Sequence, residues 1–302
     1  MSPVAYQCRA CRGTPLPQKW EGPCPRCGGY YRSNRVWVSD GEVAGAEVAR
    51  IEDGEPISAA DLFRAAGPPK KTPTGSDGLD WVFDGGLAQA GACLLCAEQG
   101  CGKSTLLLET FRRLALRGVE TLYISAEQTL KDLARQFAWL GKFPAKHMMF
   151  HAETVRDKIV ESIEKSCAAV CAVDSLHAVG EVTDEDGFSM STGGVAAVSQ
   201  LGRDLKRLAG EREVFIFAVG HVNNDGSVAG GANVRHMLDG TLVMRRPNQR
   251  SPRRTLEFEG KSRFGPVGRV AKFEMVENAG LVDRGRVEVQ AEEADEADTG
   301  GR

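Results

Sequence analysis

The hydrophobic positions of this chain follow two periods in turn. Short apolar runs such as 92–96 are typical of buried strands. Other segments place apolar residues three and four apart, as expected for one face of a helix. The pattern predicts strands over 92–97, 119–125, 168–173 and 214–219, and helices over 105–117, 129–140, 154–166 and 195–209. Strands that alternate with helices indicate an α/β fold with a parallel-rich central sheet.

A glycine-containing loop joins the first of these strands to the first helix. Backbone N–H groups in such a loop point inward, and the helix behind it adds the positive end of its dipole, so a polyphosphate fits there. We expect Lys103 to reach the β- and γ-phosphates and Ser104 to coordinate Mg²⁺. The first position holds alanine instead of the usual glycine. The predicted ATP-binding residues are Ala97, Glu98, Gln99, Gly100, Cys101, Gly102, Lys103, Ser104 and Thr105; the alternative is a glycine-rich turn before a core helix.

Three polar residues stand at or just after the ends of predicted strands. Asp174 follows the apolar run 169–173, where a carboxylate can hold the shell of a bound Mg²⁺. Glu127 follows the strand 121–125 and is predicted to activate water, the alternative being a surface residue that caps the next helix. His221 follows the strand 214–219 and is predicted to sense the γ-phosphate, unless it is an ordinary loop histidine. Lys103, Glu127 and Asp174 are therefore the first catalytic candidates.

Composition places the chain among ordinary globular proteins. It is 42% hydrophobic and 26% charged, and none of its apolar runs has the length that spans a bilayer. Its N-terminus lacks the basic and apolar segments of an export signal. We therefore expect a cytoplasmic protein without a membrane partner. The 302 residues suffice for one α/β core and a small second domain.

Four cysteines near the N-terminus have the spacing of a metal site. Cys8 and Cys11 form one pair, Cys24 and Cys27 form another, and twelve residues separate the pairs. Two such pairs allow four thiolates to converge on one Zn²⁺. The sequence therefore predicts a zinc ribbon that contacts DNA, contacts another protein, or braces the neighbouring domain.

The other cysteines are predicted to have a different role. Cys93 and Cys96 lie in a predicted strand, whose alternation sends their side chains to opposite faces, so we expect buried core residues. Cys101 lies inside the phosphate-binding loop and is expected to confer sensitivity to thiol reagents.

Composition shifts divide the chain into four parts. We predict a zinc ribbon over 1–35, a linker over 36–72, an ATPase domain over 73–282 and an acidic, disordered tail over 283–302. The segment 242–273 has nine Lys and Arg residues against two acids. Such a basic segment fits contact with a phosphate backbone, or is ordinary surface charge.

Several segments together resemble the bacterial RadA/Sms recombination and repair ATPases, relatives of RecA and of the DnaB helicases. The ribbon segment 8–30, the lead-in 74–87 and the segment 220–230 are similar to that family, and the most diagnostic piece is Lys261-Ser262-Arg263-Phe264-Gly265. The resemblance covers about 6–282 and implies a RecA-like core behind a zinc ribbon. Only twenty-two residues follow Gly280, so we expect a short form without the family's C-terminal domain, which resembles the Lon protease.

The resemblance also implies an activity. It suggests a DNA-dependent ATPase that moves on single-stranded or branched DNA as a helicase or branch-migration motor. It further implies a ring or filament of identical chains, a recombinase partner, and Lys261 and Arg263 completing the catalytic site of a neighbouring subunit. The segments 180–194 and 223–233 would then line a DNA channel or, alternatively, be ordinary surface loops. The rival hypothesis is a nucleotide-gated DNA- or partner-binding module, and a regulatory ATPase of the KaiC type is disfavoured by the ribbon.

Overall fold

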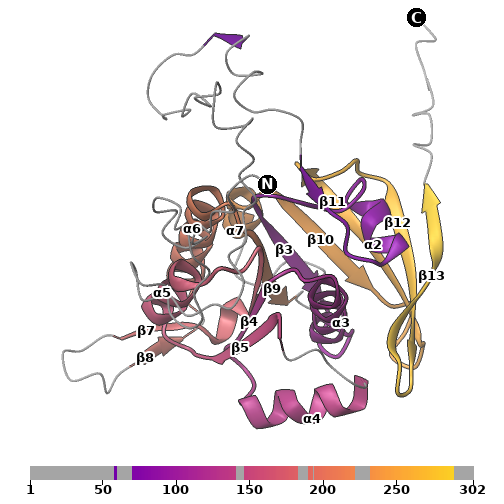
Figure 1. The fold of residues 1–302 in the computed structure, drawn as a ribbon, viewed down its shortest axis with the longest axis horizontal. Coiled ribbons are helices and arrows are strands. Elements are labelled where there is room, and N and C mark those ends of the chain that lie inside the picture. The colour runs from indigo at the N-terminus through magenta and orange to yellow at the C-terminus, as the bar shows by residue number, and fades with distance from the viewer. Residues whose placement is uncertain are drawn as a thin grey trace, which may run out of the picture.

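The computed structural model describes residues 58–59, 70–140, 146–182, 190–192, 194–221 and 232–288. The predicted zinc ribbon and most of the predicted linker lie outside these residues, as do most of the two segments expected to face DNA. Within the described part, helices pack on both faces of one large sheet (Figure 1).

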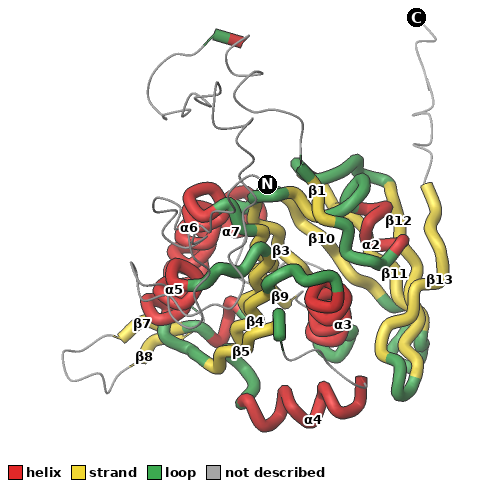
Figure 2. The backbone as a smooth tube through the Cα atoms, viewed as in Figure 1, coloured by secondary structure: helices red, strands yellow, loops and turns green. Residues whose placement is uncertain are grey.

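The central sheet has nine strands in the order β13-β12-β11-β10-β3-β9-β6-β4-β5. Six lie side by side in parallel: β10 (Gly240–Arg245), β3 (Gly91–Ala97), β9 (Phe215–His221), β6 (Val170–Asp174), β4 (Thr121–Ser125) and β5 (Met148–Ala152). The other three continue the sheet in antiparallel fashion: β11 (Arg253–Ser262), β12 (Arg269–Val276) and β13 (Gly280–Glu288). Figure 2 shows these strands in yellow as one continuous layer, the antiparallel ones at the side away from β5. The expected parallel-rich α/β fold is therefore confirmed.

Helices cover the two faces of this sheet with separate hydrophobic cores. One core contains residues of α2 (Asp77–Val82), α3 (Lys103–Leu116) and α4 (Leu130–Leu140). The other contains residues of α5 (Arg156–Lys165), α6 (Val195–Arg212) and α7 (Ala232–Met237). The strand β3 contributes alternate residues to the two cores, because successive side chains of a strand point to opposite faces. Smaller elements complete the fold: β1 (Lys71–Thr72) paired with β2 (Leu87–Ala88), the 3-10 turn η1 (Leu176–Ala178), and β7 (Gly180–Val182) paired with β8 (Met190–Thr192).

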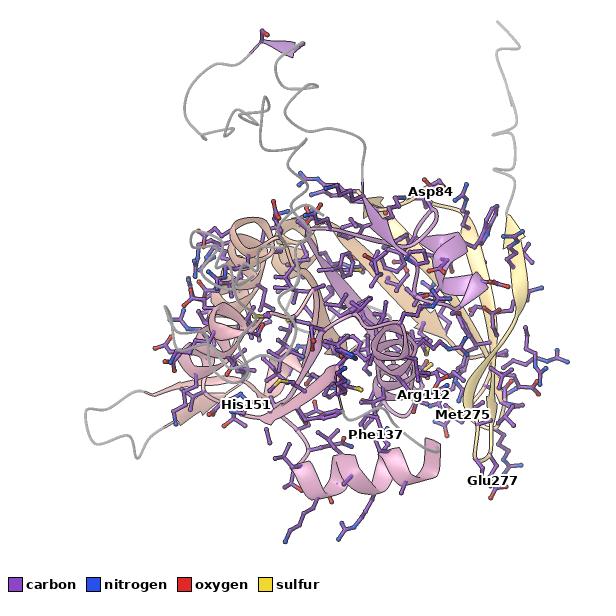
Figure 3. The ribbon with its side chains drawn as sticks, in the orientation of Figure 1. Asp84, Arg112, Phe137, His151, Met275 and Glu277 are labelled. Carbon is purple, nitrogen blue, oxygen red and sulfur yellow. The ribbon has the colours of Figure 1, made fainter. Side chains whose placement is uncertain are left out.

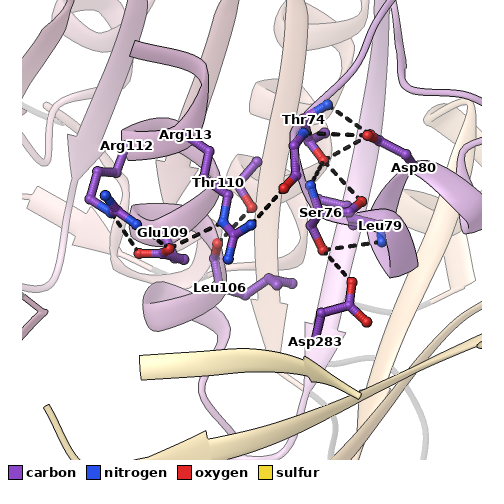
Figure 4. Close-up of polar contacts among 11 residues, drawn as sticks. Thr74, Ser76, Leu79, Asp80, Leu106, Glu109, Thr110, Arg112, Arg113 and Asp283 are labelled. Carbon is purple, nitrogen blue, oxygen red and sulfur yellow. Dashed lines mark hydrogen bonds and ion pairs between the residues drawn. The ribbon is translucent and has the colours of Figure 1, made fainter. Parts of the chain in front are cut away.

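The segment before the first core strand is tied to both α3 and β13 (Figure 4). Asp80 accepts hydrogen bonds from the backbone N–H and the hydroxyl of Thr74, at 2.7 and 2.8 Å. The Ser76 hydroxyl donates to Asp283 at 2.9 Å, and the backbone N–H of Gly78 donates to the same carboxylate. Arg113 of α3 donates to the carbonyl of Gly75. These contacts hold β13 against the start of α2.

Those contacts correct the two predicted limits of the ATPase domain. Residues 283–288, expected to begin an acidic tail, belong to β13, because Asp283 anchors that strand to α2. Lys71 and Thr72, expected in the linker, pair with β2. Within the described residues, the domain includes β1 at one end and β13 through Glu288 at the other.

Candidate functional site

The predicted site residues meet at the carboxyl edge of the parallel strands. The loop that follows β3 lies between the ends of β10 and β9, since β3 pairs with both. His221 ends β9, Asp174 ends β6, and Glu127 follows β4. Together with the loop they line a cavity of about 870 Å³. This is the edge at which ligands bind in open parallel sheets.

The loop after β3 has the backbone that a phosphate-binding loop needs. Gly100 and Gly102 have φ angles of 71° and 109°, in the region that favours glycine, and Gly102 precedes the first turn of α3. Ala97 is different, because it is the last residue of β3, is fully buried and pairs in register with Met244 and His221. Extended strand backbone does not require glycine. Alanine at this position is therefore compatible with the loop.

Lys103 bridges the loop and the neighbouring strand end. It is only 7% exposed, and its ammonium donates to the carbonyls of Ala97 at 3.0 Å and Glu98 at 3.4 Å. The same nitrogen lies 3.2 Å from Nδ1 of His221. Burial lowers the pKa of Lys103, and the negative charge of Asp174 opposes that shift. An ammonium held by neutral acceptors in a nearly dry position would gain strongly from an anionic phosphate oxygen.

Ser104 and Asp174 present two oxygens that fit a magnesium ion. The Ser104 hydroxyl donates to Oδ2 of Asp174 at 2.6 Å, and the Tyr123 hydroxyl donates to the same oxygen. Burial raises the pKa of Asp174, while these two hydrogen bonds act in the opposite direction. Hydroxyl and carboxylate oxygens are the ligands that Mg²⁺ takes together with phosphate oxygens. The donor set therefore fits the metal expected from the sequence.

Glu127 is held from two sides. Ser175 donates to its Oε1, and Nε2 of His221 lies 3.1 Å from the same oxygen. The hydrogen bond from His221 lowers the pKa of Glu127 to about 2, assisted by Ser175 and opposed by partial burial. The helix cap is instead Thr129, whose hydroxyl accepts from the backbone N–H of Asp132 at 3.3 Å. Glu127 thus does not cap α4, and its carboxylate lines the cavity as an ionised group.

The cavity also contains residues that the sequence motifs do not indicate. Arg246 follows β10, is 13% exposed at its side chain, and donates to the carbonyl of Gln99 at 3.2 Å. Arg254 of β11 is buried and donates to the carbonyl of Cys101 at 2.6 Å, which fixes the loop from outside the cavity. The other lining residues that were not predicted are Gln136, Gln249 and Met275. The sequence did contain a signal for this strand, because the apolar run 242–244 comes shortly before Arg246 and indicates a further strand that ends at this edge.

The described cysteines are core residues. Cys93 belongs to one hydrophobic core and Cys96 to the other, so the predicted placement on opposite faces is confirmed. Cys101 is buried, and burial raises the pKa of its thiol. The expectation that Cys101 confers sensitivity to thiol reagents is therefore not supported.

The segment 261–265 does not reach the cavity lining of its own chain. Arg263 donates to Oδ1 of Asp239 at 2.9 Å, and the buried Asp239 also accepts from Lys206 and from the backbone N–H of Ala92. Lys261 is exposed. Phe264 is buried in the core, and a Cβ at Gly265 would lie 2.3 Å from the carbonyl oxygen of Val82. Within one chain this segment therefore serves packing, and its expected contact with a neighbouring subunit stays a prediction.

Comparison with known proteins identifies the family. The model for the AAA domain matches residues 74–227, just over half of the chain. The chain belongs to this family. It is also 31% identical to the DNA repair protein RadA of Mycobacterium tuberculosis, over 92% of this chain and 56% of that protein. For the DNA repair protein RadA of Escherichia coli the identity is again 31%, over 90% of this chain and 58% of that protein. The resemblance inferred from the sequence is thus confirmed.

A solved structure supports the fold. The KaiC-like protein PH0186 of Pyrococcus horikoshii matches with a TM-score of 0.59 and 18% identity, over 72% of this chain and all of that protein. The core is accordingly a RecA-like or KaiC-like α/β domain. The chain spans less than three fifths of the length of the two RadA proteins. Within the described residues, no helix combines the length and apolar character needed to cross a membrane, and no cluster of His, Cys, Asp or Glu has the make-up of a metal centre. The four cysteines of the predicted zinc ribbon lie outside those residues.

Proposed function

We propose that this chain is an ATPase of DNA repair and recombination that hydrolyses Mg·ATP in the cavity at the end of β3. The observation that carries the proposal is the convergence of Lys103, Ser104, Asp174 and Glu127 on that one cavity. Membership of the AAA domain family and the similarity to DNA repair proteins support the same conclusion.

The side chains divide the chemistry between them. Lys103 would leave the carbonyls of Ala97 and Glu98 and donate to the β- and γ-phosphate oxygens. Ser104 and Asp174 would hold Mg²⁺, which when bound neutralises charge on the phosphates. Glu127 is ionised at neutral pH and would orient a water molecule and accept its proton.

His221 connects these two groups. Its Nδ1 faces Lys103 and its Nε2 faces Glu127, an arrangement that fits the tautomer with its proton on Nε2. If Lys103 moved to a γ-phosphate, Nδ1 of His221 would lose its partner, while Nε2 would keep its contact with Glu127. His221 would thereby report the presence of the γ-phosphate to the segment that follows β9.

The finer proposal is that DNA stimulates this ATPase and that the assembled protein moves on single-stranded DNA. In that assembly Lys261 and Arg263 would act on the cavity of a neighbouring chain. Arg263 is 60% exposed at its side chain, so a second chain has access to it. The alternative is a nucleotide-gated binding module, in which Lys261 and Arg263 take no part in hydrolysis.

The test is ATP turnover with and without single-stranded DNA. We expect turnover that DNA stimulates, and its loss in Lys103→Ala under both conditions. Lys165→Ala removes an exposed lysine of α5, outside the basic segment 242–273, and should behave as the unmodified chain. ATP binding without turnover would favour the binding module, and turnover insensitive to DNA would refute the motor.

A further inference from the structure

The cavity has two sides, divided by the loop after β3. His221, Asp174 and Glu127 follow β9, β6 and β4, which all lie on one side of β3 in the sheet. Arg246 and Gln249 follow β10, the neighbour of β3 on the other side. Met275 of β12, a strand on the same side of β3, belongs to the lining too. Asp174, Glu127 and His221, which suit the chemistry of a metal ion and a water molecule, therefore lie in one half of the cavity. The described residues that line the other half lack carboxylates and histidines of this kind.

The guanidinium of Arg246 is fixed against the wall of this second half. Its Nη2 donates to the carbonyl of Gln99 at 3.2 Å, and its Nε lies 3.4 Å from a carboxylate oxygen of Glu98. Two contacts through different nitrogens hold the plane of the group. They also offset the negative charge of Glu98, which would otherwise repel phosphate from the loop. A planar cation with a fixed orientation is suited to stacking on an aromatic ring.

Met275 supplies an apolar surface to the lining of the same cavity. Its methyl group packs against the loop, since a Cβ at Gly102 would lie 2.9 Å from it. Figure 3 places Met275 near α3, whose Arg112 is labelled, and close to the turn that carries Glu277. A thioether is polarizable and adapts to an aromatic face. Gln249 is exposed and adds a rotatable amide to this half.

We propose that Arg246 and Met275 form the nucleoside subsite of the cavity, a statement that rests on the proposed ATPase function. With the phosphates on the loop and the γ-phosphate toward Glu127, the ribose and base extend toward β10. The base is held by stacking, and Gln249 contacts its edge. A rotatable amide both donates and accepts, so it suits adenine and guanine alike. The subsite therefore selects the large ring of a purine and discriminates weakly between the two purines.

The test compares a ligand that has a base with one that has none. Binding of ADP and of inorganic tripolyphosphate is measured for the unmodified chain, Arg246→Ala, Arg246→Lys and Arg245→Ala. Arg246→Lys should weaken ADP binding about tenfold, or about 1.4 kcal/mol, and leave tripolyphosphate within about twofold. Arg246→Ala also leaves Glu98 without its cation, so it should weaken both ligands, and ADP about tenfold more than tripolyphosphate. Lysine keeps the positive charge and loses the planar face, so this variant separates stacking on the base from electrostatic attraction to the phosphates. Arg245 pairs with Glu257 and Glu259, and its removal should change neither ligand.

The unmodified chain gives a second readout. GDP should bind within about fivefold of ADP, and CDP about tenfold more weakly, since a pyrimidine offers less area for stacking. Equal losses of ADP and tripolyphosphate in Arg246→Ala would overturn the subsite and assign Arg246 to the loop. A preference for ADP over GDP of about a hundredfold would overturn it too. If the unmodified chain binds tripolyphosphate but ADP no better, the subsite is wrong and the phosphate site stands; if it binds neither, the proposed function itself fails.

Discussion

Replacing Gly265 by alanine should destabilise the domain, because that glycine touches the backbone of another segment. An added Cβ would lie 2.3 Å from the carbonyl oxygen of Val82 and 3.3 Å from the backbone nitrogen of Asp84. Neither atom belongs to a flexible side chain. Ordinary contacts begin at about 3.4 Å, so the two segments must separate by about 1 Å.

That separation disturbs an aromatic cluster. Phe264 precedes the glycine, and its ring lies 5.0 Å from that of Phe215 and 5.9 Å from that of Phe83, centroid to centroid. Lys71 also donates to the carbonyl of Phe264 at 3.3 Å. Overpacking of this kind costs about 1–3 kcal/mol. For a domain of this size, about 2 kcal/mol corresponds to a fall in Tm of roughly 4–8 °C.

The assay is thermal unfolding followed by circular dichroism, with Gly210→Ala as the matched control. Gly210 lies within α6, and a Cβ there would meet no atom within 4 Å. Alanine stabilises a helix interior by up to about 1 kcal/mol relative to glycine, so the control should melt at the same or a higher temperature. A Gly265→Ala protein that melts at the same temperature as the unmodified chain would show that this contact is not rigid, contrary to the packing described above.

Three further outcomes concern the site and the ribbon. Glu127→Gln should keep ATP binding and slow turnover about 10²–10⁴-fold, as single-turnover kinetics will measure, since it keeps the shape and removes the base; unchanged turnover would exclude this role. Lys103→Ala and Arg263→Ala chains, each inactive alone, should regain activity when mixed in equal amounts if the arginine acts on a neighbouring chain, because about one interface in four joins an intact Lys103 to an intact Arg263. An inactive mixture in which subunit exchange is verified would show that Arg263 does not act on a neighbour's site. Metal analysis should find about one Zn²⁺ per chain, reduced in Cys24→Ser; a zinc content near zero in reduced, freshly purified protein would refute the ribbon.

Four of the six parallel strands, β3, β4, β6 and β9, could be predicted from the sequence because they are buried on both faces. Such strands appear as uninterrupted apolar runs, as in 92–97 and 214–219. The loop after β3 could be predicted for the same reason, since its glycines and Lys103 follow such a run. The positions of Asp174 and Glu127 at this edge could be predicted because each lies at or just after the end of such a strand.

The antiparallel half was largely missed. The strand β11 alternates between buried and exposed residues along Arg253–Ser262, and its charged positions conceal the apolar ones. The parallel edge strand β5, at the opposite side of the sheet, was missed as well, because it contains exposed and half-buried residues and has no sustained apolar run. Arg246 was missed because its position in the cavity lining depends on the pairing of β10 with β3, a contact between residues about 150 positions apart. No local motif records such a contact.

Two anions would compete for Arg263 in an assembly: the carboxylate of Asp239 in its own chain and the phosphate of a nucleotide bound to a neighbouring chain. In the single chain the carboxylate of Asp239 holds Arg263 and Lys206 together and accepts from the backbone of β3. An arginine that moves to a neighbour's phosphate must first give up this partner, and Lys206 remains to keep the carboxylate neutralised. The transfer is then an exchange of one anion for another, and its equilibrium depends on the charge of the bound nucleotide. If Arg263 acts on a neighbouring chain as proposed, losing the γ-phosphate would weaken only one of the two competitors, and Arg263 would return to Asp239 of its own chain after hydrolysis.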